Sequence, residues 1–225
     1  PARSTAETAR AKGIKIYGDF FGTAMAKKLS VQHRCADLIV ANNVLAHVQD
    51  INDFVAGFTH LLKPNGVATF EFPHLLQMVR RNQFDTVYHE HYSYLSLATV
   101  LRIFARNGLS VFDVAEYQTH GGSLRVFAQR KDTGLEPVSP AVGQMIARES
   151  KAGMSTVEFY TDLQKKACEV KGALLDFLQE ARRKGDKVAG YGAAAKGNTL
   201  LNFCGIGPDL VEFVADLSPH KQEKY

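Results

Sequence analysis

The sequence predicts an α/β fold in which helices wrap a largely parallel sheet, followed by a second, smaller α/β lobe. In the first half, segments with apolar residues at steps of three and four alternate with short apolar runs. Near the carboxyl end, an apolar run, a glycine-rich turn and a helix-like segment precede another apolar run. Alternation of strand and helix is typical of parallel sheets, because each crossover helix returns the chain to the same edge.

The first-half elements follow from apolar periodicity and from their start and stop residues. In segment 51–66, apolar residues recur at the spacing of one helix face, and Pro64 and Gly66 end the helix. The run at 36–43 has few polar positions and is expected to be a buried strand. By the same reasoning we expect further helices at 4–13, 23–30 and 97–108, and further strands at 14–18 and 67–72.

Two β-rich runs, 109–117 and 122–130, are predicted to pair antiparallel and to close the sheet. Pro, Gly and Ser are concentrated in the segment that follows, so we expect a first domain at 1–130 and a smaller lobe at 131–225. One long amphipathic helix is predicted over 157–183.

The composition indicates a soluble, cytoplasmic protein. The formal charge is only +4, and basic residues are interspersed with acids, so no nucleic-acid surface is expected. No apolar run reaches about 18 residues, and the amino end lacks the apolar region of a signal peptide. The three isolated cysteines, without a CxxC pair, favour a reducing compartment and no zinc site among them. Both ends look cut, which suggests a fragment of a longer chain.

The stretch "GYGAAAKG" is a candidate phosphate-binding turn. Gly190, Gly192 and Ala195 match G-x-G-x-x-A between a predicted strand and a predicted helix, and Lys196 could add a positive charge. Asp216 ends the next strand, where a dinucleotide-binding fold places its ribose-binding acid. The alternative is a tight strand-to-helix turn that needs small residues.

Polar and aromatic residues follow two of the predicted strands. Asp19 comes after strand 14–18 and could accept a hydrogen bond from adenine, with the ring of Phe20 beside it. The same residues could instead form a helix cap and part of the core. Asn42 ends strand 36–43, and His47 follows it as either a ligand-facing or a capping residue.

The run "DTVYHEHYSYLS", residues 85–96, concentrates rings and a carboxylate. A metal site is the weaker interpretation, because His89 and His91 would point the same way only in an extended strand, and no cysteine lies near. Proton transfer fits better, since Glu90 could position a histidine base and tyrosines could stabilise an oxyanion. The alternative is a surface loop. The stretch "THGGSLR", 119–125, is similarly either a ligand-approach site or a hairpin turn.

In order and spacing, "GIKIYGDFF", "YHEHYSYLS", "THGGSLR" and "GYGAAAKGNTLLN" resemble the sugar-nucleotide C-methyltransferases, which depend on S-adenosylmethionine (SAM). The resemblance spans nearly the whole chain. It implies a partial, Rossmann-like class I methyltransferase core followed by a Rossmann-like lobe that holds the nucleotide sugar. The family's zinc-binding amino-terminal domain and its Gly-rich SAM loop are absent here, so the fragment alone is expected to be inactive.

The resemblance also implies roles for individual residues. SAM would be bordered by Asp19 and Phe20 at its adenine and by Ala41 and Asn42 near its reactive methyl. The sugar would face His47, Tyr88, Glu90 and His91, with His91 as the base. The nucleoside diphosphate would be held by Tyr191, Gly192 and Lys196, while the acceptor pocket would add His120 and Ser123. No metal is implied at this site.

The implied reaction transfers a methyl group to the carbon alpha to the ketone of a keto-deoxysugar linked to a nucleoside diphosphate. His91 would remove the proton, and Tyr88 or His47 would stabilise the enolate. An NAD-dependent oxidoreductase built on "GYGAAAKG" and Asp216 is the alternative, although it leaves the first half without a role. A non-catalytic nucleotide-binding module is a third possibility. The sugar, the nucleotide base and the oligomeric state are not predicted.

Overall fold

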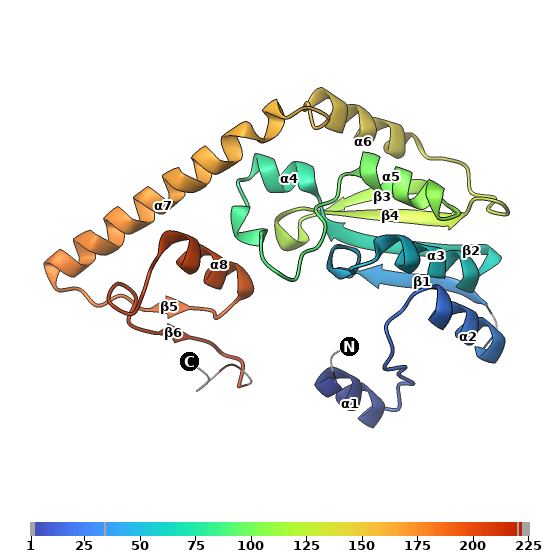
Figure 1. Cartoon of the computed structure of the whole chain (residues 1–225), viewed down its shortest axis with the longest axis horizontal. Helices are drawn as coiled ribbons and strands as arrows, with labels where there is room; N and C mark the ends of the chain where they lie inside the picture. The colour runs from blue at the N-terminus through green and yellow to red at the C-terminus, as the bar shows by residue number, and fades with distance from the viewer. Residues whose placement is uncertain (1–2, 34, 220, 222–225) are drawn as a thin grey trace.

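The computed structural model describes residues 3–33, 35–219 and 221. A mixed sheet with helices packed against it forms the first part of the molecule, and a long helix leads from there to a small second lobe (Figure 1). The predicted class, α/β with a second and smaller α/β lobe, is therefore confirmed.

The main sheet has the strand order β1-β2-β4-β3. β1 (Ala36–Asn42) pairs in parallel with β2 (Leu62–Pro73), so their carboxyl ends meet at one edge. β4 (Ser123–Arg130) pairs antiparallel with both β2 and β3 (Leu109–Tyr117), which confirms the predicted antiparallel pair. The turn between β3 and β4 lies at the same edge, because Ser123 pairs with Pro73.

Helices begin where local capping chemistry allows them to begin. α3 (Ile51–Leu61) starts after Asp50, whose carboxylate accepts hydrogen bonds from two backbone amides of the first turn, at 2.9 and 3.0 Å. α5 (Leu97–Arg106) starts after Ser96, whose hydroxyl accepts from the Thr99 amide at 3.1 Å. The remaining helices of this part are α1 (Arg3–Ala11), α2 (Thr23–His33), α4 (Leu75–Arg80) and α6 (Pro140–Lys151).

The core lies between the sheet and the helices α3, α5 and α6. Its centre is a row of rings, with Phe58 and Phe70 centroids 4.4 Å apart and Phe70 and Phe104 centroids 4.7 Å apart. α6 contributes Val142 and Met145 to this core. The domain boundary at residue 130 stays a prediction, although α6, which follows it, packs on the first sheet.

Two strand predictions were wrong in part. Residues 14–18 form no strand, because no described segment pairs with them, and an extended run without a neighbour has no ladder of hydrogen bonds. β1 forms as predicted but is not buried, since Leu38 and Val40 are 58% and 57% exposed. Among the described residues β1 pairs on one side only, with β2, and helices cover one of its faces.

The second lobe is a small βαβ unit reached through α7 (Glu158–Lys184), the long helix predicted over 157–183. Gly185, with a φ of 78°, ends this helix in the left-handed conformation that glycine adopts most readily. β5 (Gly190–Tyr191), α8 (Ala195–Cys204) and β6 (Val214–Ala215) follow, and the two strands are parallel. A helix with the length and sustained apolarity to cross a bilayer is not found among the described residues.

Candidate active site

The residues between α4 and α5, 81–96, form a segment that we call the histidine loop. Its far end is held to the carboxyl end of β2, because the Leu75 amide donates to the Leu95 carbonyl at 3.0 Å. Its middle is held to the segment after β1 by a 2.9 Å hydrogen bond from the Tyr92 amide to the Ala46 carbonyl. The loop therefore lies at the edge where the two parallel strands end, which is where open α/β sheets bind ligands.

His91 is held in one tautomer by the backbone of this loop. Its Nδ1 lies 2.8 Å from the Thr86 carbonyl oxygen, which can only accept, so Nδ1 carries the proton and Nε2 does not. Rings surround it, with the centroid of Tyr88 at 4.3 Å and that of His47 at 4.6 Å. An unprotonated Nε2 in an aromatic enclosure can take a proton from a bound molecule.

The surroundings of His91 also favour its neutral form. Burial lowers the pKa of the His91 imidazole, and the charges of His47 and Lys196 lower it further. The hydrogen bond to Thr86 and the charge of Glu90 raise the pKa by less, so it stays below its ordinary value of 6.5. His91 is therefore unprotonated, and able to act as a base, at neutral pH.

His47 mirrors this arrangement from the other side of the pair. It ends the short helix Leu45–His47 directly after β1, and its Nδ1 donates to the Glu90 carbonyl oxygen at 2.9 Å. Both imidazoles thus donate a hydrogen bond from Nδ1 to a backbone carbonyl oxygen of the histidine loop. Only the backbone of Glu90 makes this contact, and its side chain is exposed.

Two tyrosines complete the enclosure. Burial raises the pKa of the Tyr88 phenol, and the charges of Glu90 and Asp85 raise it further. Burial likewise raises the pKa of Tyr94, whose ring centroid lies 6.1 Å from that of His91. Both phenols stay protonated at neutral pH and can donate a hydrogen bond to a developing oxyanion.

A groove of about 700 Å³ separates the histidine loop from α8. Phe84 of the loop and Phe203 of α8 hold the two walls together, with ring centroids 5.0 Å apart. Lys196, on the first turn of α8, is near enough for its charge to act on His91. The groove is lined by Val87, Tyr88, His89, Glu90, Ala195, Asn198, Thr199, Asn202 and Phe203. The structure thus brings the "YHEHY" and "GYGAAAKG" motifs together.

Comparisons with known proteins bear on both parts of the chain. The family described as "C-methyltransferase C-terminal domain" matches residues 118–225, and the one described as "Methyltransferase domain" matches residues 6–114. The C-methyltransferase NovU of Streptomyces niveus is 34% identical over 224 residues, a match that covers 100% of this chain.

The chain is similar to C-methyltransferases along its whole length.

The chain spans about half, 53%, of the length of that curated relative. Among solved structures, a SAM-dependent methyltransferase from Mesorhizobium loti matches at 17% identity, with a TM-score of 0.43, covering 57% of this chain and 77% of its own. A magnesium protoporphyrin IX methyltransferase from Synechocystis also matches at 17% identity, with a TM-score of 0.34, covering 43% of this chain and 45% of its own. These TM-scores are too low to establish a shared fold.

The expected cofactor-binding residues lie before α2 and at the end of β1. Phe21 packs on Phe58, with centroids 5.1 Å apart, whereas Phe20 is 84% exposed and has no place in the core. Ala41 is buried in β1, and Asn42 is exposed at its end. Next to them, the buried Oδ1 of Asn43 has no hydrogen-bond partner among the described residues. A polar group left in this state fits an edge that receives a ligand.

His120 and Ser123 do not reach the groove. Ser123 is buried, and its hydroxyl donates to the Thr119 carbonyl at 3.1 Å within the β3–β4 turn. His120 is exposed in the same turn, with a φ of 53°. The hairpin-turn interpretation of "THGGSLR" accounts for both positions, and their role in the acceptor pocket stays a prediction.

The Asp216 carboxylate holds the glycine turn of the second lobe by hydrogen bonds to the backbone. Its carboxylate accepts hydrogen bonds from the amides of Ala193 and Ser218, both at 2.8 Å, and lies 3.3 Å from the Lys221 ammonium. These interactions lower the pKa of the Asp216 carboxyl, the Ser218 amide most of all. A carboxylate engaged in this way is poorly suited to bind a ribose, which removes the main support for an NAD site.

Several groove residues were missed by the sequence reasoning. Asn198, Thr199 and Asn202 lie at helical spacing on α8, in "GNTLLN" directly after the glycine motif. That spacing was visible in the sequence, but which face of the helix meets the histidine loop was not. Among the described residues, no group of three or more His, Cys, Asp or Glu side chains converges as a metal site.

Proposed function

We propose that this chain carries the acceptor-binding and proton-abstracting part of a SAM-dependent C-methyltransferase. The acceptor is a keto-deoxysugar linked to a nucleoside diphosphate, and the methyl group goes to the carbon alpha to the ketone. The observation that carries the proposal is His91, whose Nδ1 donates to the Thr86 carbonyl and whose Nε2 is left as a base, on the loop whose residues Val87–Glu90 line the groove.

The chemistry follows from the low reactivity of a C–H bond. A carbon becomes nucleophilic only after it loses a proton, and an adjacent ketone makes that loss easier by moving charge onto its oxygen. His91 Nε2 takes the proton, and the phenol of Tyr88 donates a hydrogen bond to the enolate oxygen, whereas His47 could donate to it only as a charged imidazolium, because its Nδ1 proton is held by the Glu90 carbonyl. Attack of the enolate carbon on the methyl group would break the bond between that methyl and sulfur, and S-adenosylhomocysteine would leave.

SAM supplies the methyl group as an activated sulfonium. Asp19 and Phe20 would hold its adenine, and Ala41 and Asn42 would hold it near the reactive methyl. The exposed ring of Phe20 and the unpartnered Asn43 Oδ1 support this assignment. The protein's further contribution is to hold the two reactants at about 3 Å from each other.

Lys196, Gly192 and Tyr191 would hold the diphosphate. Gly192 has a φ of 95°, which lets the backbone turn directly into α8. The amino end of α8 carries unpaired amides and a partial positive charge, to which Lys196 adds a full one. A diphosphate at this position would put the attached sugar in the groove beside His91.

The test is turnover by the full-length protein. Incubation with SAM and a panel of nucleoside-diphosphate keto-deoxysugars should give a sugar that is heavier by one methyl group in mass spectrometry. Carbon-13 NMR should place that methyl on carbon. Methylation of oxygen or nitrogen, or turnover with none of these sugars, would refute the proposal.

A further inference from the structure

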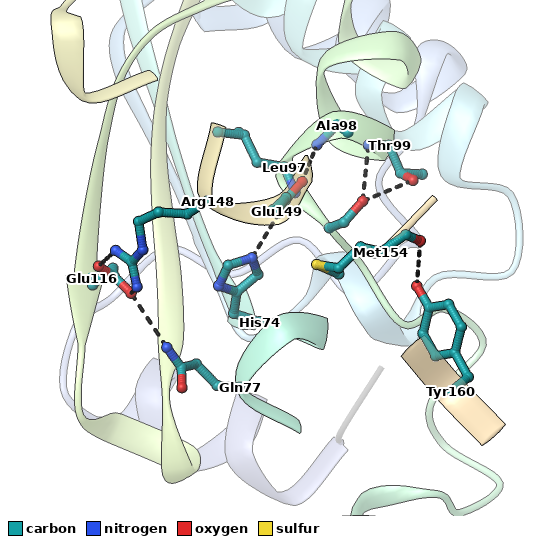
Figure 2. A network of polar contacts seen from close by, with 11 residues as sticks. His74, Gln77, Leu97, Ala98, Thr99, Glu116, Arg148, Glu149, Met154 and Tyr160 are labelled. Atoms are coloured by element: carbon teal, nitrogen blue, oxygen red, sulfur yellow. Dashed lines mark hydrogen bonds and ion pairs between the residues drawn. The ribbon is translucent and has the colours of Figure 1, made fainter. Parts of the chain in front are cut away.

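A buried carboxylate on α6 joins the elements that flank the histidine loop. Glu149 is 3% exposed, and its oxygens face three donors: the His74 Nε2 at 2.7 Å, the Leu97 amide at 2.6 Å and the Ala98 amide at 3.0 Å. Figure 2 shows the carboxylate between the His74 ring and the first turn of α5. Glu149 therefore caps α5 from another helix.

These donors stand on the two sides of the histidine loop. His74 directly precedes α4, which leads into the loop, and Leu97 is the first residue after it. The His74 amide also donates to the Gly122 carbonyl at 3.0 Å, in the β3–β4 turn. Together with the hydrogen bond from the Leu75 amide to the Leu95 carbonyl, Glu149 thus holds the segment before α4 next to the start of α5.

The charge of Glu149 is retained in this environment. Burial raises the pKa of the Glu149 carboxyl, but the hydrogen bonds from His74, Ala98 and Leu97 outweigh it, so the pKa lies below 4.5. His74 is 1% exposed, and its Nδ1 has no hydrogen-bond partner among the described residues. The His74 ring is therefore oriented by the hydrogen bond between its Nε2 and the Glu149 carboxylate. A buried hydrogen bond of this kind imposes geometry, because either partner would be left unsatisfied if the other moved away.

The same helix leads to the other wall of the groove. After α6, the Tyr160 hydroxyl donates to the Met154 carbonyl at 2.9 Å and closes the turn into α7 (Figure 2). α7 then packs against α8, since Lys171 donates to the Phe203 carbonyl at 3.1 Å. Glu149 therefore contacts the elements next to the loop by hydrogen bonds, and it is linked to α8 through α6 and α7.

We propose that Glu149 is a positioning residue for the histidine loop, acting through His74 and the first turn of α5. It does not touch the groove itself. It holds the segment before α4 against the start of α5, and through these two elements it fixes the place of His91 relative to a bound sugar. The catalytic part of this inference rests on the proposed function, whereas the structural part does not.

Hydrogen exchange tests the structural part without any ligand. In the full-length protein, Glu149→Gln should speed amide exchange across residues 84–94 by about tenfold or more, because the loop opens locally when its ends are released. The matched control is Val142→Ala, which truncates a buried apolar side chain of the same helix and removes no hydrogen bond. Equal exchange in the loop for the two variants would overturn the proposal.

Kinetics test the catalytic part. Glu149→Gln should lower kcat about 10- to 100-fold, because a small displacement of a reacting group is costly, and should leave the KM for SAM unchanged. Val142→Ala should keep its kcat although its melting temperature falls. A kcat loss of Glu149→Gln no larger than that of Val142→Ala would overturn the inference. If the wild-type protein does not methylate the sugar, the proposed function fails, and hydrogen exchange still decides whether Glu149 positions the loop.

His74→Leu provides a second variant in case Glu149→Gln does not fold. It leaves Glu149 on the amides of α5 and releases only the first end of the loop. Faster exchange confined to residues 84–94, together with a lower kcat, is expected. Unchanged exchange and kcat would count against the role of Glu149.

Discussion

At the scale of single residues, the chemistry depends on which nitrogen of His91 carries the proton. The Thr86 carbonyl, 2.8 Å from Nδ1, settles this by accepting a hydrogen bond. A histidine held in this way presents an unprotonated Nε2 as long as the ring is neutral, and burial favours the neutral ring.

The first prediction concerns pH. A lowered pKa means that His91 loses its second proton at a lower pH than a free histidine, so activity should be retained to a lower pH than a free histidine would allow. The acid limb of kcat/KM for the sugar should have its midpoint below 6.5. A pH profile of the full-length protein measures this directly, and a midpoint above 6.5 would contradict the assignment of His91 as the base.

The second prediction concerns the proton-transfer step itself. His91→Asn keeps a polar side chain but removes the base, so solvent deuterium should no longer enter the sugar at the carbon alpha to the ketone. Proton NMR in deuterated buffer follows this exchange. His60→Asn, on the exposed end of α3, is the matched control and should exchange at the wild-type rate. Wild-type exchange in His91→Asn would exclude His91.

At the scale of elements, the groove depends on the approach of α8 to the histidine loop. Neither wall forms a pocket alone, and the contact between Phe84 and Phe203 joins them. Lys196 on α8 consequently has two roles: it would bind the diphosphate, and its charge lowers the pKa of His91.

The third prediction follows from this double role. Lys196→Ala should raise the KM for the nucleotide sugar about 10- to 100-fold, the typical loss for one charge-assisted hydrogen bond. Because the charge of Lys196 lowers the pKa of His91, its removal should also move the acid limb of kcat/KM to higher pH. Lys187→Ala, at an exposed position before β5, is the control. A change in KM without a shift of the acid limb would show that the charge of Lys196 does not affect the pKa of His91.

At the scale of the whole molecule, Glu149 connects α6, α5 and the segment before α4 in one buried network. Its pKa is lowered by folding, so it stabilises the folded state where the carboxyl is ionised in both states. That contribution is complete above pH 4.5 and is lost as the pH falls through the lower, native pKa.

The fourth prediction uses this dependence. The difference in free energy of unfolding between the wild type and Glu149→Gln should be constant between pH 7 and pH 5 and should shrink below pH 4.5. Urea unfolding followed by circular dichroism at each pH gives the two curves. A difference that is independent of pH down to pH 3 would show that the charge of Glu149 makes no contribution.

Most helix starts were predictable because their signals are local, although the helix expected over 51–66 ends at Leu61 and residues 62–66 belong to β2. Asp50 and Ser96 cap α3 and α5 within one turn, and glycine ends α7, so the sequence indicated these ends closely. The strand expected at 14–18 failed because a strand needs a neighbour, and no described segment pairs with it. Leu38 and Val40 are exposed for a different reason, because both lie on the face of β1 that the described residues leave uncovered.

The sequence by itself determined the α/β class, the two lobes, the family resemblance and the residue types of the candidate site. These depend on periodicity, caps and motifs, which are properties of neighbouring residues. Only the tertiary structure decided that Thr86 orients His91 and that α8 faces the histidine loop. It also decided that Glu149 joins His74, before α4, to the first turn of α5. Such contacts bring together residues far apart in the chain, and no local pattern encodes a distance between them.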